Sequence, residues 1–311
     1  MKNTFLSILT FVIIGNSLAQ GDTLPNNWRL KASYGFNGTQ SSFVNWNAGG
    51  RNNISLLGYI DASANYIKGI YKWGNDLGLA LGGIKDIGKG GMSPLQKTDD
   101  KIDLTSNFGL EINNHLYGAI LGNFKTQFMD GNSFPNDSII TSKFMAPGYL
   151  TFAFGVDYKP TGYVSIYLSP IASKMTFVND ELLSNTGAFG VKGATYDGLG
   201  NVIAAGKRFR GEFGAYFKLM YNKEIVRNIN MKSKLELFSN YLNNPGNIDV
   251  AAEIIFNFKV NSWFSASLNL NLLYDDDIEV RDINGDIGPR TQFKSLLGLG
   301  VSYTVRNFNG K

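Results

Sequence analysis

The stretch "KIDLTSNFGLEINNHLYGAILGNFKTQF", Lys101 to Phe128, decides the fold. From Ile102 to Ile112 every second residue is apolar or small, and most of the residues between them are polar or charged. Asn113 and Asn114 interrupt this alternation, which then resumes. A period of two is that of a strand with one apolar face. The stretch therefore predicts two antiparallel strands joined by a tight turn.

The same alternation recurs along the whole chain of 311 residues. Soluble proteins have strands of about 5–6 residues, whereas a strand tilted across a bilayer needs about 9–11. Most of the segments here have the greater length, which favours strands that cross a membrane. We expect twelve strands, near 28–36, 54–67, 70–84, 101–112, 115–128, 149–159, 163–178, 209–221, 229–241, 247–259, 263–275 and 291–305.

The connections between these segments alternate in length, with the link at 242–246 as the exception. Barrels of the outer membrane have short turns on the periplasmic side, longer outer loops and an even strand count. The sequence therefore predicts an all-β, antiparallel, up-and-down transmembrane β-barrel of about 12 strands, with long outer loops and short periplasmic turns. The long connections are 37–53, 85–100, 129–148, 179–208 and 276–290, and the short ones are Lys68-Gly69, Asn113-Asn114, 160–162, 222–228 and Asn261-Ser262.

Two alternatives to this fold remain open at this point. Pro170 interrupts segment 163–178, so that 14 strands instead of 12 is a second count. A periplasmic β-sandwich also alternates, with its apolar side inward. A sandwich, however, has no reason to keep its short links at one end, and the barrel is the preferred interpretation.

The N-terminus predicts export to the outer membrane. Lys2, the apolar run Phe5–Ile14 and the small residues around Ala19 are typical of a cleaved signal peptide. We expect a signal peptide at 1–19 and a barrel at 20–311. The chain has no Cys, which excludes disulfides and lipid attachment at a cysteine. A net charge of +4 is too small to indicate a nucleic-acid partner.

The polar faces of the strands predict a lumen of mixed charge. Opposite signs lie close together, as in Arg210 and Glu212, which favours paired side chains over a selectivity ring of one sign. Loop 179–208 is long enough to fold into the opening and plug it. The charges expected to point inward are Arg29, Lys31, Asp61, Asp103, Glu111, Lys125, Arg210, Glu212, Lys218, Lys232, Lys234, Glu236, Glu253 and Lys259.

No pattern in the chain indicates catalysis, a cofactor or a metal centre. The single histidine, His115, follows a short turn and is expected at the periplasmic end, far from where a lipid-modifying enzyme would need it. The acidic run Asp275–Asp286 is rich in oxygen ligands, yet it lacks the spacing of a twelve-residue calcium loop. We therefore expect no enzyme and no catalytic, cofactor-binding or metal-binding residue, and we leave a cation at Asp275–Asp286 open.

Several strings together resemble a Bacteroidetes-type family of outer-membrane proteins that is known as a domain of unknown function. The resemblance implies an outer-membrane barrel and brings no activity or site residues with it. It rests on "WNAGG" (46–50), "YKWGNDL" (71–77), "KTDDKIDLTSNFG" (97–109), "TQFMDG" (126–131), "KFMAPGYL" (143–150), "GVDYKP" (155–160), "YLSPIASKMTFV" (167–178), "AFGV" (188–191), "LFSNYL" (237–242) and "YDDDIEV" (274–280).

Two functions follow from a barrel with these features. One is a narrow pore or transporter for small solutes. The other is a barrel that does not transport and acts as a partner or accessory subunit of an outer-membrane secretion or surface-protein complex. The expected partners are outer-membrane lipid and, in the second case, other outer-membrane or cell-surface proteins.

Overall fold

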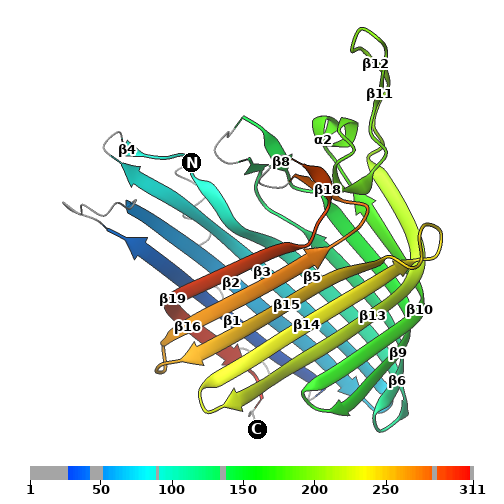
Figure 1. The fold of residues 1–311 in the computed structure, drawn as a ribbon. Coiled ribbons are helices and arrows are strands. Elements are labelled where there is room, and N and C mark those ends of the chain that lie inside the picture. The colour runs from blue at the N-terminus through cyan, green and yellow to red at the C-terminus, as the bar shows by residue number, and fades with distance from the viewer. Residues whose placement is uncertain (1–26, 43–51, 89–90, 134–137, 282–285, 309–311) are drawn as a thin grey trace.

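Twelve long antiparallel strands close into one barrel (Figure 1). The structure is a computed structural model that describes residues 27–42, 52–88, 91–133, 138–281 and 286–308. Pairing runs in sequence order around the wall, and β1 pairs with β19 to close it. The strands are β1 (Trp28–Ser41), β2 (Asn52–Lys68), β3 (Tyr71–Gly88), β5 (Gln96–Asn113), β6 (Leu116–Thr126), β9 (Gly148–Thr161), β10 (Val164–Phe177), β13 (Phe209–Val226), β14 (Ile229–Asn240), β15 (Ile248–Lys259), β16 (Phe264–Tyr274) and β19 (Gln292–Arg306).

Closure explains why the strands are stable together, because it leaves no long edge with unpaired backbone groups. The prediction of a 12-stranded antiparallel barrel is confirmed, and the count of 14 is wrong. Segment 163–178 is the single strand β10. The register of β10 shifts between Ser169 and Ala172, so that Pro170, which has no N–H to donate, lies in a bulge.

The short connections gather at one end of the barrel, which we call the turn end. Their polar side chains hold the turns closed. The Asn113 side chain accepts hydrogen bonds from the backbone N–H groups of His115 and Leu116, both at 3.0 Å. Asn261 accepts in the same way from Trp263 at 3.0 Å and Phe264 at 2.7 Å. The last strand, β19, ends here as well (Figure 1).

The outer face of the wall is apolar. Large side chains stand exposed on alternate residues of neighbouring strands, which only a hydrocarbon solvent accommodates without cost. Aromatic rings meet on this face near the turn end, where Trp28 contacts Tyr66 at 5.2 Å and Trp73 at 5.9 Å between ring centroids. The exposed apolar rows include Phe36, Leu56, Ile60, Leu104, Phe108, Ile120, Phe152, Phe154, Leu168, Phe213, Leu297, Leu299 and Val301.

Longer connections gather at the opposite end, the loop end, where several carry their own structure (Figure 1). Ala146, Val178, Leu183 and Val191 form a small core between the β6–β9 and β10–β13 connections. None of the described helices has the length and hydropathy needed to cross a membrane. The elements here are β4 (Gly91–Met92), β7 (Gly131–Asn132), β8 (Ile140–Ser142), α2 (Glu181–Asn185), the 3-10 turn η1 (Ala188–Gly190), β11 (Thr195–Tyr196), β12 (Val202–Ala204), β17 (Glu279–Arg281) and β18 (Ile287–Pro289).

The loop 179–208 does not descend into the lumen. Its helix α2 lies above the strand ends, and the hairpin of β11 and β12 projects away from the barrel (Figure 1). The predicted signal peptide at 1–19 lies outside the described residues.

Candidate functional site: the barrel lumen

The lumen has two unlike halves. The filled half is lined by β5, β6, β9, β10, β13 and β14, and the open half by β15, β16, β19, β1, β2 and β3, in wall order. In the open half, the buried inward residues of the described strands are Asn37, Ala80 and Gly82. In the filled half they include Asp103, Thr105, Tyr117, Ala119, Leu121, Asn123, Ala153, Asp157, Tyr167, Ser169, Ala172, Thr176, Glu212, Tyr216, Lys218, Glu236 and Phe238.

Apolar side chains pack together inside the filled half, in addition to those on the outer face of the barrel. Tyr167 is 1% exposed, and its hydroxyl donates to the backbone oxygens of Ala119 at 3.0 Å and Ala153 at 2.7 Å. Its ring meets Tyr216 edge to face at 6.3 Å between centroids. The full cluster is Ala119, Leu121, Ala153, Tyr167, Ala172, Tyr216 and Phe238.

A network of charged side chains lies beside this cluster. Glu236 pairs with Lys125, accepts a hydrogen bond from the Tyr216 hydroxyl at 2.7 Å and lies 4.0 Å from the Lys218 ammonium. Asp103 pairs with Lys234 at 2.7 Å and accepts from the Asn123 amide at 2.7 Å. Buried charges require this kind of pairing, since an isolated one is costly to desolvate.

The network also crosses the lumen. Lys101 on β5 pairs with Glu253 on β15 at 3.0 Å, and five strands lie between these two on either side. Two further bridges join the halves: Lys294 with Asp99 at 2.7 Å, and Lys232 with Asp61 at 3.6 Å. The lumen is therefore constricted by side chains and is not a wide channel. The prediction of inward, paired charges is confirmed here for Asp61, Lys232 and Glu253.

Small polar residues line most of the open half. Serine, asparagine and glycine predominate at inward positions, as in Ser33, Ser63, Asn269 and Gly300. Such short side chains reach less far from the wall than the tyrosines and lysines opposite. Inward residues such as Asp76 and Thr304 are exposed even though they face the inside of a closed barrel. Water must therefore reach them through the lumen.

The side chains of Tyr59 and Asn37 in the open half lie along the wall instead of pointing into the lumen. Tyr59, Gly35 and Ser302 are register partners on β2, β1 and β19, and Tyr59 spans Gly35 to hydrogen-bond with Ser302. A Cβ at Gly35 would lie 2.5 Å from the ring carbon Cζ of Tyr59. Asn37 similarly leans over Gly298, the register partner of Ser267, and donates to Ser267 at 2.9 Å. Glycine at these positions lets the bridging side chain stay close to the backbone.

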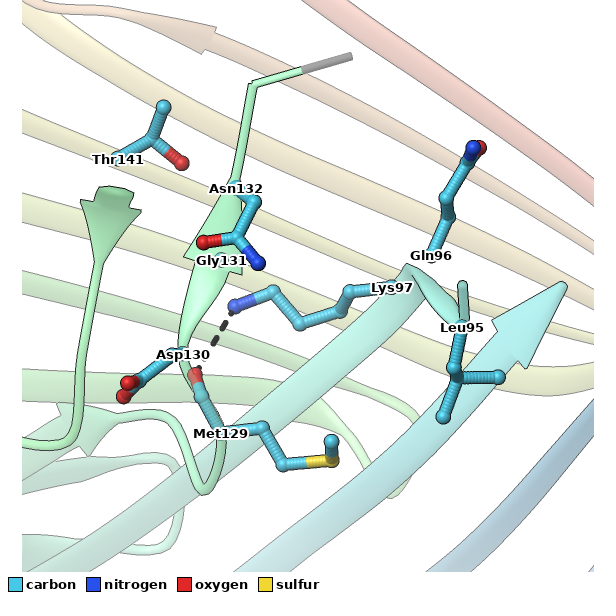
Figure 2. Close-up of a pocket in the computed structure, with 8 residues that line it drawn as sticks. All are labelled: Leu95, Gln96, Lys97, Met129, Asp130, Gly131, Asn132 and Thr141. Atoms are coloured by element: carbon cyan, nitrogen blue, oxygen red, sulfur yellow. Dashed lines mark hydrogen bonds between the residues drawn. The ribbon is translucent and has the colours of Figure 1, made fainter. Parts of the chain in front are cut away.

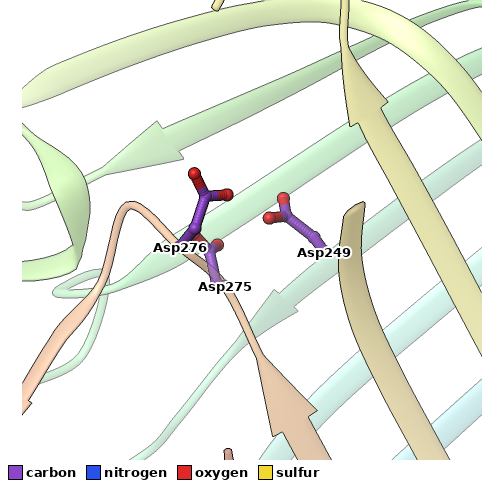
Figure 3. A group of neighbouring side chains, drawn as sticks. All are labelled: Asp249, Asp275 and Asp276. Atoms are coloured by element: carbon purple, nitrogen blue, oxygen red, sulfur yellow. The ribbon is translucent and has the colours of Figure 1, made fainter. Parts of the chain in front are cut away.

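An acidic group lies at the loop end, where Asp249, Asp275 and Asp276 come together (Figure 3). The Lys174 ammonium lies between two of them, 2.6 Å from Asp249 and 2.9 Å from Asp275. Asp276 accepts from the Asn247 amide at 2.7 Å. The chain's own lysine thus supplies the positive charge that a cation would bring. In the predicted run Asp275–Asp286, residues 282–285 lie outside the described residues.

A pocket of about 180 Å³ lies at the loop end between the start of β5 and β7 (Figure 2). Its one lysine, Lys97, donates to the Met129 carbonyl at 3.3 Å, to Gln127 at 3.1 Å and to Ser142 at 3.3 Å, and pairs with Asp100 at 3.3 Å. An ammonium has three protons to donate, so this group is fully engaged. The pocket, whose lining also includes Asp130, therefore offers no free positive charge to a ligand.

His115 is exposed in the turn between β5 and β6, at the turn end as expected. Its Nδ1 lies 3.1 Å from the Lys159 carbonyl oxygen, so the ring helps to hold the neighbouring strand.

Sequence reasoning did not single out several lumen residues. Lys101 and Tyr216 stand at inward positions of clearly alternating segments. Their odd or even place in the alternation would therefore have been enough to identify them as lumen residues. Lys174 is harder to assign to the lumen, because the bulge at Pro170 reverses which residues of β10 face inward, from odd-numbered before it to even-numbered after it.

Comparison with known proteins finds a family of unknown function. The model described as "Protein of unknown function (DUF3078)" matches residues 38–132, and it states neither an activity nor a taxon. The match supports the resemblance to a domain of unknown function. Among curated proteins, none matches this chain.

Solved structures with similar folds are outer-membrane barrels. The COG4313 outer membrane channel from Pseudomonas putida F1 is 10% identical, with 92% of this chain and 98% of that chain covered and a TM-score of 0.37. The P. putida toluene transporter TodX is 11% identical over 93% and 92%, with a TM-score of 0.30. The translocator domain of the autotransporter NalP from Neisseria meningitidis is 10% identical over 96% and 94%, with a TM-score of 0.28. These scores are low, and the fold assignment rests on the strand pairing.

Proposed function

We propose that this protein lies in the outer membrane and forms a narrow pore for small solutes, with the path along the open half of the lumen. The observation that carries the proposal is the asymmetry of burial: most buried inward residues lie in the filled half, whereas the inward residues of the open half, apart from Asn37, Ala80 and Gly82, are half-buried or exposed. A barrel of twelve strands lies between those that close on their own side chains and those that leave a channel. Filling one half leaves a path along the other.

Conductance in planar bilayers tests this proposal. We expect the wild type to give small, discrete conductance steps. The double variant Lys101→Ala/Glu253→Ala removes the bridge that spans the lumen and should raise the conductance of each step severalfold. Lys223→Ala is the matched control, because Lys223 stacks on the ring of Tyr163 near the turn end, 4.2 Å from its centroid, and takes no part in the crossing bridges. Absence of conductance from both wild type and double variant would exclude the pore.

Delivery to the membrane is part of the same proposal. A signal peptide at 1–19 would direct export and leave a mature chain from residue 20. Mass spectrometry of the protein from outer-membrane fractions tests this cleavage, and a mature chain that retains Lys2 would contradict it.

The hairpin of β11 and β12 favours a second candidate function, a barrel that serves as a partner in an outer-membrane complex. The hairpin forms its own two-stranded sheet, and Leu199 and Ile203 are 90% and 70% exposed. Isolated two-stranded hairpins are marginally stable in water. Co-purification after mild detergent extraction, with and without residues 195–204, distinguishes this role. A partner that is lost with the hairpin, together with an absence of conductance, would favour it over the pore.

A further inference from the structure

Three basic residues lie close together on the wall at the turn end of the open half. Arg29 and Lys31 are two residues apart on β1, and Lys31 pairs in register with Arg306 on β19. Even-numbered residues of β1 face outward, as the exposed Phe36 shows, so Arg29 and Lys31 face inward. Arg306 faces inward as well, because it is the register partner of Lys31. All three are exposed. We refer to Arg29, Lys31 and Arg306 as the basic cluster.

The basic cluster is a like-charge contact within one sheet. Directly opposed residues on paired strands have Cβ atoms about 4.5–5.5 Å apart, and equal charges at this distance repel. The neighbouring inward residues on β2 are Ser63 and Asn65, which carry no charge. Within the described part of the chain, no ion pair reaches any member of the cluster.

The nearest acidic groups of the described chain form no ion pair with the cluster. Asp61 on β2 pairs with Lys232 at 3.6 Å. Asp76 stands on β3, two strands from Lys31. A further cation, Lys259, lies at the same end of the open half, at the end of β15. The turn end of the open half thus has an excess of positive charge.

The filled half shows that this excess is local. At its turn end, Lys159 pairs with Asp157 at 3.0 Å. Lys72, on the bordering strand β3, lies 3.5 Å from Glu111 and contacts the Tyr117 ring. Each of these cations has a carboxylate beside it.

We propose that the basic cluster is a binding site for small anionic solutes, which it holds through their carboxylate or phosphate groups at the turn-end mouth of the lumen. Arginine binds such groups with two parallel hydrogen bonds, and lysine adds a point charge. An anion bound between Lys31 and Arg306 would attract both side chains and so offset the repulsion between their positive charges. The inference rests on the proposed pore for the route of the solute, and it assigns the class of solute.

The reversal potential under a gradient of KCl tests the selectivity. We expect the wild type to prefer chloride, and Arg29→Gln/Lys31→Gln/Arg306→Gln to lose that preference. The control Lys72→Gln/Glu111→Gln removes a compensated pair and should keep it. The preference should also weaken as salt rises, because the Debye length falls from about 10 Å at 0.1 M to 3 Å at 1 M. A cation-selective or unselective wild-type pore would overturn the anion site and leave the pore itself intact.

A binding measurement decides the inference even without conductance. Inorganic pyrophosphate is titrated calorimetrically into the full chain folded in detergent. We expect the triple variant to bind at least about tenfold more weakly than wild type, and the Lys72→Gln/Glu111→Gln control to bind as wild type does. Heat-modifiable migration on gels confirms that each variant is folded. Equal binding by wild type and triple variant, or no binding by wild type, would overturn the site.

Discussion

The two halves of the lumen are built on the same alternation and differ in what occupies the inward positions. In the filled half these positions carry Tyr167, Tyr216 and Phe238, all buried, and paired charges, of which Glu236 and Lys218 are buried. In the open half they carry mostly serine, asparagine and glycine, and water reaches them. One strand pattern therefore makes a packed core on one side of the barrel and a wet wall on the other. The difference lies in the volume of the inward side chains.

The same division extends to the electrostatics. Glu236 in the filled half contacts Lys125, Lys218 and Tyr216, so that its charge is neutralised away from water. Lys31 and Arg306 in the open half face each other, and neither forms an ion pair with a carboxylate among the described residues. Charges in the filled half are paired within the fold, whereas the basic cluster of the open half is exposed. Variants that exchange these properties test the division.

The largest effect is expected from Glu236→Ala. The substitution leaves Lys125 and Lys218 without their shared carboxylate in a buried setting, which typically costs about 3–5 kcal/mol. Asp61→Ala is the matched variant in the open half, where the pair with Lys232 is partly exposed and worth about 0–1 kcal/mol. Urea unfolding in detergent micelles measures both. Similar losses for the two variants would mean that the halves do not differ as described.

The alternation of the sequence was enough to predict this architecture. The twelve strands lie within a few residues of the predicted segments, because a lipid-facing wall leaves no freedom in which face is apolar. The inward position of Asp103 and Glu236 followed from parity in the same way. The bridge across the lumen did not follow from it, because Lys101 and Glu253 are 152 residues apart in sequence and meet only through the closure of the barrel.

The division into two halves was also beyond the sequence alone. Tyr59 and Tyr167 both stand at inward positions, yet one lies flat against Gly35 and the other packs into a cluster. Which of these happens depends on the neighbouring strands, and strand neighbours across the closure between β1 and β19 are not adjacent in sequence.

A smaller effect, on both conductance and stability, is expected from Gly35→Val. The new side chain would occupy the place of the Tyr59 ring and push it off the wall into the open half. Conductance should fall, and the cost of overpacking is about 1–3 kcal/mol. The control Gly38→Ala meets nothing closer than 3.4 Å and should leave conductance unchanged. The combination of Gly35→Val with Tyr59→Ala should restore conductance, and failure to do so would show that Tyr59 does not narrow the path.

The smallest effect is local and concerns the loops above the filled half. Asp180 caps α2, accepting from the Leu183 N–H at 3.0 Å, and pairs with Lys143 at 2.7 Å. The hydrogen bond from Lys143, followed by that from Leu183, holds the pKa of the Asp180 carboxyl below its usual value. A lowered pKa stabilises the folded loop above the ordinary pKa of aspartate and loses that contribution as the pH falls through the folded value.

Hydrogen exchange of the Leu183 amide, expressed as a protection factor, measures this contribution. Acidification from about pH 6 to below the ordinary aspartate pKa of about 3.9 should lower protection in the wild type. Asp180→Asn keeps a good cap but has no titrating group, so its protection should not change with pH. Asp180→Ala removes the cap and should cost about 0.5–2 kcal/mol locally at every pH. Amides of β14, whose hydrogen bonds lie within the barrel wall, should be unaffected in all three proteins. A pH response that persists in Asp180→Asn would assign the effect to another group. A response that spreads to β14 would show that the loops and the filled half unfold together instead of as separate units.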